Sequence, residues 1–159
     1  MSDRIQIVAV GKMKEKYFNE TVSEYVKRLT RFCKLTVIEV GDERNPKEQN
    51  KAQELIALSR ESSRILQHIK NTTVVAMDVK GARVSSERFA EIIKSYYESN
   101  KSVSFVIGGS MGLGKDILDK SDLKLSMSDM TFPHQLARVI LIEQLYRAFK
   151  IIANEVYHK

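Results

Sequence analysis

The chain is poor in the residues that build disulfide and metal frameworks. Its 159 residues include one cysteine, three histidines, two prolines and no tryptophan. A lone cysteine excludes an internal disulfide and fits a reducing compartment. The histidines are far apart, form no HxH or HxxxH pair and do not lie next to Cys33, so the sequence predicts no metal site. We expect Cys33 to be a small buried or half-buried residue.

Long hydrophobic runs are also missing. No apolar run reaches the ~18 residues that a membrane span needs. The opening MSDRIQIVAVGK holds an apolar stretch too short for a secretion signal. Hydrophobic residues make up 43% of the chain and charged residues 29%, which argues against disorder. We therefore expect a cytoplasmic protein, free of membrane and metal, with one domain over residues 1–159.

Basic residues outnumber acidic ones, 26 to 20, giving a net charge of +6. A positive balance favours an anionic partner, and nucleic acid is the usual one. Lys12, Lys14 and Lys16 are candidates for phosphate contacts, although lysines near a helix start are often simply solvated. Charge alone leaves both interpretations open.

Apolar β-branched stretches alternate with amphipathic ones along the chain. The first pattern predicts strands at Ile5–Val10, Leu35–Val40, Thr73–Val79, Val103–Ile107 and Leu123–Met127. The second predicts helices at about residues 15–31, 47–70, 86–98 and 136–152, with a short helix before the last strand. This alternation predicts an α/β fold in which a parallel sheet is flanked by helices.

The last expected helix, LARVILIEQLYRAFKII, is apolar over an arc of roughly 240°. Its polar band holds Glu143, Gln144, Arg147 and Lys150, and Arg138 stands alone on the apolar side. One sheet face cannot cover so wide an arc. A central core helix would fit, but we favour a homodimer in which Arg138 finds a carboxylate or backbone partner at the interface.

Two expected strands end in loops that suit a ligand. GGSMGLG, residues 108–114, follows one strand, and residues 128–134 follow the other. Parallel sheets place ligand sites at such carboxyl ends, and glycines let the backbone approach a ligand closely. The glycine spacing matches neither the Walker pattern nor GxGxxG, although Asp129 about 20 residues later echoes a dinucleotide site. The pattern indicates two backbone loops around something flat and partly charged.

Longer segments carry a more specific pattern: FVIGGSMGLGKDI, LSMSDMTFPHQLARVILIEQLYRAFKI, the final YHK, IVAVGKMKEKY and MDVKG. Together they closely resemble the RlmH (YbeA) family over essentially the whole chain. Members are SPOUT-class methyltransferases that move a methyl group from S-adenosylmethionine to N3 of a pseudouridine in 23S rRNA of the assembled ribosome. The resemblance implies a homodimer, in agreement with the pattern of the last helix. It also implies a C-terminal trefoil knot, which patterning alone would not indicate.

The resemblance also implies where S-adenosylmethionine binds. It places the cofactor against Met77 and Gly108, and completes the pocket with Met127, Ser128, Asp129, Met130, Thr131 and Phe132. Backbone groups there would bind the adenine edge, and the methionines and phenylalanine would offer apolar contacts, although such methionines also fill cores. Met111 departs from the family pattern, in which a polar residue is common, so its role stays open.

Arg147, Tyr157 and His158 are the candidates for positioning the substrate or handling its proton, with His134 as second choice. Methyl transfer to a ring nitrogen needs alignment, and the uracil-type N3–H must lose its proton, leaving an anion that a nearby cation stabilises. Arg147 could equally pair with Glu143 on the same helix face. His158 titrates in a suitable range but stands next to the last residue.

A second hypothesis is a ribosome- or RNA-binding dimer that lacks methyl transfer. The intact glycine loop and the YHK tail favour the enzyme. Failure to bind S-adenosylmethionine would favour the binding protein.

Overall fold

The computed structural model describes residues 4–43 and 50–157. Within them, five strands form one parallel sheet in the order β2-β1-β4-β3-β5, and five helices accompany it. The elements are β1 (Arg4–Val10), α1 (Lys16–Leu29), β2 (Lys34–Val40), α2 (Lys51–Leu66), β3 (Thr73–Arg83), α3 (Ser86–Glu98), β4 (Val103–Ile107), α4 (Lys115–Lys120), β5 (Leu123–Ser126) and α5 (His134–Ile152). The predicted α/β fold is confirmed.

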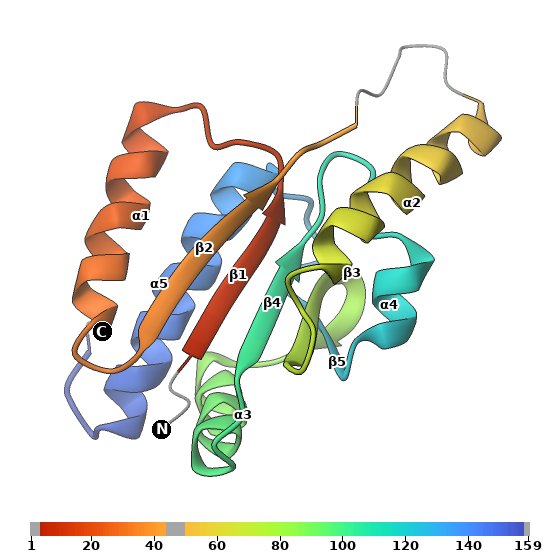
Figure 1. Cartoon of the computed structure of the whole chain (residues 1–159). Helices are drawn as coiled ribbons and strands as arrows, with labels where there is room; N and C mark the ends of the chain where they lie inside the picture. Colours follow the sequence, from red (N-terminus) through yellow and green to blue (C-terminus); the bar gives the residue numbers. More distant parts are fainter. Residues whose placement is uncertain (1–3, 44–49, 158–159) are drawn as a thin grey trace.

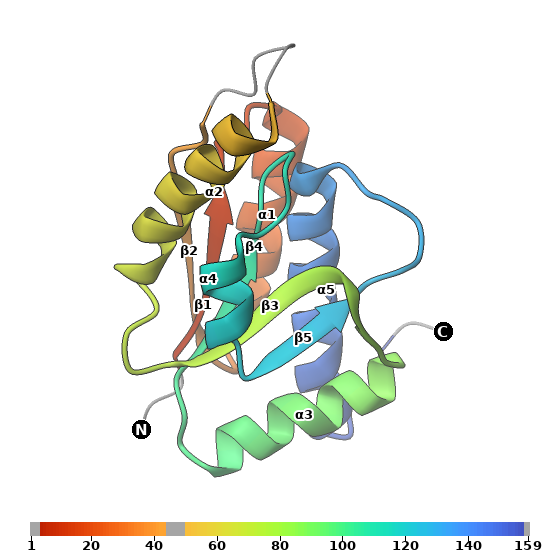
Figure 2. The ribbon, with the colours of Figure 1, turned by 90° about the vertical axis from the view of Figure 1, so that its right-hand side faces the viewer.

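Helices cover both faces of the sheet. Figure 1 shows α1 and α5 against one face and α2 and α4 against the other, and Figure 2 shows α3 crossing near the lower end of α5. Leu29, Phe105 and Leu145 belong to the core on the first side, and Ile65 and Ile117 to the core on the second. Because both faces are buried, β4 is buried along its whole length and is apolar except for Ser104.

The predicted helix over residues 47–70 is shorter in the structure. α2 begins after Asn50, whose side chain accepts a hydrogen bond from the Gln53 N–H in a capping box. The helix ends at Leu66, and a turn with Asn71 at a φ of 60° leads into β3. The predicted start at residues 47–49 lies outside the described residues.

The prediction that β3 ends at Val79 is wrong. The strand continues to Arg83, and its pairing with β5 shifts register between Met77 and Ala82. Gly81 makes this possible, because a Cβ there would lie 2.7 Å from the backbone of Leu125. A glycine within a strand can thus mark a bulge and a close backbone approach as well as a strand end.

α5 packs on the sheet between α1 and α3, and these two helices cover part of its wide apolar arc. Leu136, Val139 and Ile140 stay half-buried. The structure holds one chain, so the homodimer remains a prediction.

The interface role predicted for Arg138 is wrong, because its partners lie in the same chain. The side chain is buried, and its guanidinium donates to the Glu39 carboxylate at 2.5 Å and to the Gly11 carbonyl at 2.6 Å. Both partners lie at or just after the ends of strands that the fold places beside α5, and neither is near Arg138 in sequence.

Packing of α5 predicts a clear contrast between two truncations. Ile142→Ala should lower the free energy of unfolding by about 2–5 kcal/mol, because this side chain is fully buried. Leu55→Ala, at a position 59% exposed, should change it by less than about 0.5 kcal/mol. Urea unfolding measures both, and equal losses would contradict this placement of α5.

Candidate functional site

A cavity of about 240 Å³ opens at the carboxyl edge of β3, β4 and β5. Its walls are the end of β3, the glycine-rich loop after β4 and the segment between β5 and α5, which Figure 2 shows as a wide loop. Seven of the eight residues predicted for the cofactor line it: Met77, Gly108, Met127, Ser128, Met130, Thr131 and Phe132. The two strand exits singled out in the sequence therefore meet in space.

Asp129 is the predicted residue that does not line this cavity. Its side chain is exposed and pairs with Arg83 at the extended end of β3. The loop turns locally, because the Ser128 hydroxyl accepts a hydrogen bond from the Met130 N–H at 3.0 Å. Asp129 thus joins the loop to β3 at the surface, and its neighbours face the cavity.

The glycine loop brings bare backbone to the cavity. The Gly112 N–H donates to the Gly109 carbonyl at 3.0 Å, and Gly112 has a φ of 74°. A Cβ on Gly108 would lie 2.4 Å from the Gly112 carbonyl oxygen, so only glycine fits there. Met111 is not among the lining residues.

A second cavity, of about 210 Å³, adjoins the first. It lies between β3, β5, the start of α3 and the middle of α5. The two cavities share four lining residues: Met77, Leu125, Ser126 and Met127. A ligand that displaces these side chains slightly would reach both.

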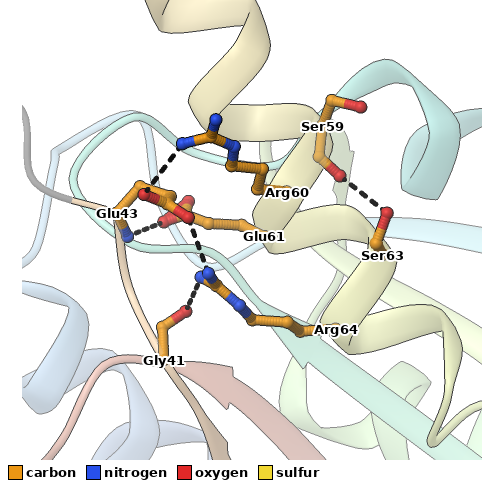
Figure 3. Close-up of polar contacts among 7 residues, drawn as sticks. All are labelled: Gly41, Glu43, Ser59, Arg60, Glu61, Ser63 and Arg64. Atoms are coloured by element: carbon orange, nitrogen blue, oxygen red, sulfur yellow. Dashed lines mark hydrogen bonds and ion pairs between the residues drawn. The ribbon is translucent and has the colours of Figure 1, made fainter.

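A buried carboxylate lies behind the glycine loop. Glu61 on α2 is 3% exposed, and a Cβ on Gly109 would lie 4.0 Å from its Oε2. That oxygen accepts the Glu43 N–H at 3.0 Å, and Oε1 has no hydrogen-bond partner among the described residues. Arg60 and Arg64 pair with Glu43 instead (Figure 3). Burial raises the pKa of Glu61, and the Glu43 N–H only partly opposes this.

Arg147 and Tyr157 meet around Glu143 toward the C-terminal end of α5. Glu143 Oε1 accepts from Arg147 Nη2 at 2.8 Å and from the Tyr157 hydroxyl at 3.0 Å. The guanidinium of Arg147 lies 4.3 Å from the centre of the Tyr157 ring, a cation–π contact. The pairing with Glu143, one of the two alternatives left open for Arg147, is present in the structure, and Tyr157 joins it. His158 lies outside the described residues.

The protonation of this cluster follows from its surroundings. Burial, and then the hydrogen bond to Glu143, raises the pKa of Tyr157 far above its usual range, so the phenol stays protonated at neutral pH. Arg147 remains charged. Its Nε is buried and has no hydrogen-bond partner in the part of the chain that the structure describes. The cluster therefore offers donors, and Tyr157 is not a base.

Within one chain, this cluster and the cavity are separate. His134 and Ala137, at the start of α5, line the cavity. At a rise of about 1.5 Å per residue, Arg147 lies about 20 Å further along the helix than His134. The structure therefore brings the second-choice His134 to the first cavity. Arg147 and Tyr157 line neither cavity, although Gln144 of the second cavity donates to Glu143 of their cluster at 2.9 Å.

Some lining residues had no signal in the sequence. Asp78 and Val79 line the cavity from the last two positions of the expected strand, where nothing in their residue types marks them. Ser110 and Ala137 lie within segments already singled out, but nothing in their residue types marks them.

The described residues offer neither a metal-binding group nor a membrane-spanning helix. In residues 4–43 and 50–157, no group of three or more His, Cys, Asp and Glu could hold a metal ion. No helix in these ranges is both long and apolar enough to cross a membrane.

Comparison with known proteins identifies the class. The family model described as "Predicted SPOUT methyltransferase" matches residues 4–158. The chain belongs to the SPOUT methyltransferase family. A probable methylase family protein from Haemophilus influenzae Rd KW20 shares the fold, with a TM-score of 0.57 and 17% identity over 100% of this chain and 72% of that one.

Relatives of much higher sequence identity indicate a group within the family to which the chain is closely similar. The chain is 52% identical to the "Ribosomal RNA large subunit methyltransferase H" of Acetivibrio thermocellus, over 98% of this chain and 99% of that protein. It is 51% identical to the protein of the same name from Clostridium novyi, again over 98% and 99%. The resemblance seen in the sequence is confirmed.

Glu61 predicts a pH dependence of stability. A raised pKa means that Glu61 binds its proton more tightly in the folded chain than in the unfolded chain. The stability that this proton contributes is fully present below the unfolded pKa of 4.5, and it is lost as the pH rises through the pKa of the folded state. Glu61→Gln should therefore gain stability relative to wild type over the pH range that starts near 4.5 and ends above the raised pKa of the folded state. Urea unfolding across this range measures it. Glu98→Gln, at an exposed position, is the control. If the stability of Glu61→Gln changed with pH in parallel with that of wild type, the raised pKa of Glu61 would be contradicted.

Proposed function

We propose that the chain is an S-adenosylmethionine-dependent methyltransferase that acts on N3 of a pseudouridine in 23S rRNA of the assembled ribosome. One observation carries this proposal: the identity of 52% to a protein named for large-subunit rRNA methylation extends over 98% of the chain. Both the cavity and the Arg147 cluster lie inside the matched region. A ribosomal substrate would place the protein in the cytoplasm.

The cavity suits S-adenosylmethionine. Gly108 leaves a wall of bare backbone that a Cβ would fill, and Met77, Met127 and Phe132 supply apolar surface. Ligands of this size occupy pockets of about 300–1,000 Å³, which supports use of both adjoining cavities. Residues 127–132 would hold the cofactor from the other side, with Asp129 contributing through its backbone. The bound cofactor supplies a methyl group on a positively charged sulfur.

The Arg147 cluster suits the substrate. When the N3–H of the target base loses its proton, negative charge spreads over the neighbouring oxygens, and a fixed cation stabilises it. Glu143 and Tyr157 hold the Arg147 guanidinium in place. Because Tyr157 stays protonated, it would position the base, and His158 remains the candidate for accepting the proton.

A second copy of the chain would bring the two parts together. The separation of about 20 Å along α5 supports a homodimer in which one subunit's pocket faces the partner's Arg147 cluster. Half-buried Leu136, Val139 and Ile140 lie on α5 near the pocket and offer apolar surface for such contact. We extend the family's trefoil knot to this chain on the same basis.

Methyl transfer tests the proposal directly. Purified protein, labelled S-adenosylmethionine and ribosomes from a strain lacking this activity should give label in 23S rRNA. Arg147→Ala should lower the rate by about 10²–10³-fold, because one fixed charge is lost from the reacting anion. Arg88→Ala, on the exposed face of α3, is the matched control and should keep full activity.

The outcomes of this assay separate the alternatives. His158→Ala should also reduce the rate if it accepts the proton. Cofactor binding without label in 23S rRNA would point to another RNA. No cofactor binding at all would overturn the enzyme and favour the RNA-binding dimer.

Mixed dimers test whether the site is shared. Gly108→Ala should block the pocket and Arg147→Ala should disable the cluster, so each variant alone should be nearly inactive. Mixing them through unfolding and refolding should restore about a quarter of wild-type activity, since half the dimers are mixed and each mixed dimer has one intact site. No recovery, with dimers confirmed by light scattering, would contradict a shared site.

A further inference from the structure

The segment from the end of β1 to the first residue of α1, residues 11–16, carries three exposed lysines at the carboxyl edge of the sheet. Lys12, Lys14 and Lys16 all point into solvent, whereas Met13 between them is buried. Glu15, between Lys14 and Lys16, is exposed as well, so Gly11 and Met13 are the buried residues of this segment. We call residues 11–16 the basic loop.

Arg138 and Glu39 hold the backbone of the basic loop. Arg138 donates to the Gly11 carbonyl at 2.6 Å and to Glu39 Oε2 at 2.5 Å. The same carboxylate oxygen accepts the Met13 N–H at 2.7 Å. The backbone is thus fixed on both sides of Lys12, by groups that lie below the surface.

Further contacts hold the loop at each end. The Gly11 N–H donates to the Val40 carbonyl at 2.8 Å, and Gly11 adopts a φ of 90°. The Asn19 side chain donates to the Met13 carbonyl at 2.8 Å. Because the backbone is already fixed, only the lysine side chains have to be ordered when an anion binds.

The lysines of this loop are available for an anionic partner. Lys12 and Lys14 form no ion pair with any residue in the described ranges. Lys16 lies 3.7 Å from Glu20, but both side chains are highly exposed and such pairs contribute little. The loop is therefore a preformed cationic surface.

The basic loop adjoins the pocket. A Cβ on Gly11 would lie 3.9 Å from Nε2 of His134, and His134 lines the cavity. Lys12 follows Gly11 directly. A nucleotide whose base reaches this cavity would have its neighbouring phosphates close to the loop.

We propose that the basic loop binds the phosphates of the RNA nucleotides next to the target, and that Arg138 and Glu39 are positioning residues for it. This inference rests on the proposed function and names the part of the protein that meets the RNA backbone. Phosphates dominate the affinity of such interfaces, and each contact contributes about 0.7–0.9 to the salt dependence of binding.

Paired lysine variants test the loop. Lys12→Ala/Lys14→Ala should bind ribosomes at least tenfold more weakly at low salt, and the slope of log K against log salt should fall by about 1.5. Lys34→Ala/Lys101→Ala removes the same charge from exposed positions at the opposite edge of the sheet, and should change neither quantity. Equal losses in both pairs, or unchanged binding in the first, would overturn the proposal.

Glu39→Gln tests the positioning residues. It keeps all the lysines, so ribosome affinity should fall while the salt slope stays at the wild-type value. Thermal unfolding should shift to a lower temperature, because the buried Arg138 guanidinium loses its carboxylate partner. Calorimetric binding of S-adenosylmethionine by the folded variant should stay near wild type, and a role in folding alone would not combine this with a loss of ribosome affinity. Unchanged ribosome affinity in this variant would overturn the positioning role.

Assays on the wild-type protein distinguish a failure of the basic-loop proposal from a failure of the proposed function. If it binds S-adenosylmethionine and methylates 23S rRNA, but the Lys12→Ala/Lys14→Ala pair binds ribosomes normally, only the basic-loop proposal fails. If wild type neither binds the cofactor nor transfers a methyl group, the proposed function fails first.

Discussion

The buried guanidinium of Arg138 joins the three elements on which the functional edge of the molecule depends. A charge inside a protein is costly unless it is paired and hydrogen-bonded. Here a carboxylate on β2 and two carbonyls at the end of β1 accept hydrogen bonds from the two Nη atoms, while Nε has no partner among the described residues. Burial alone would raise the pKa of Glu39, but the hydrogen bonds from Arg138 and the Met13 N–H lower it overall, so the pair stays charged. The start of α5 is thereby fixed beside the strand ends, with His134 at the cavity.

The same helix separates the parts of the site. α5 starts at the cavity and carries Arg147 away from it toward the other edge of the sheet, where Glu143 and Tyr157 hold the guanidinium. In a protein of this size, one chain forms a pocket of glycine backbone and apolar side chains, together with a distant cluster of donors. Association of two copies is the simplest way to bring a cation to the reacting base, and the half-buried apolar residues of α5 are placed for it.

Much of the fold was predictable, because strand and helix periodicities report which faces are buried. The alternation of elements and the two loop exits at Gly108 and Met127 follow from such patterns. The bulge that extends β3 past Gly81 was not predictable, since a glycine there fits a strand end equally well. Nor could the sequence show that Arg138 pairs with Glu39, because a pattern within one helix does not identify a carboxylate from a remote strand. The outward turn of Asp129 depends likewise on Arg83 at the end of that bulge.

A crystal structure with S-adenosylhomocysteine would test most directly whether this edge of the sheet is a methyl-donor site. The ligand should lie between the glycine loop and residues 127–132, in contact with Met77, and extend toward the adjoining cavity. Its sulfur should face the Arg147 cluster of a second subunit. Ligand bound elsewhere, or no ligand at saturating concentration, would contradict the assignment of the cavity and with it the proposed reaction.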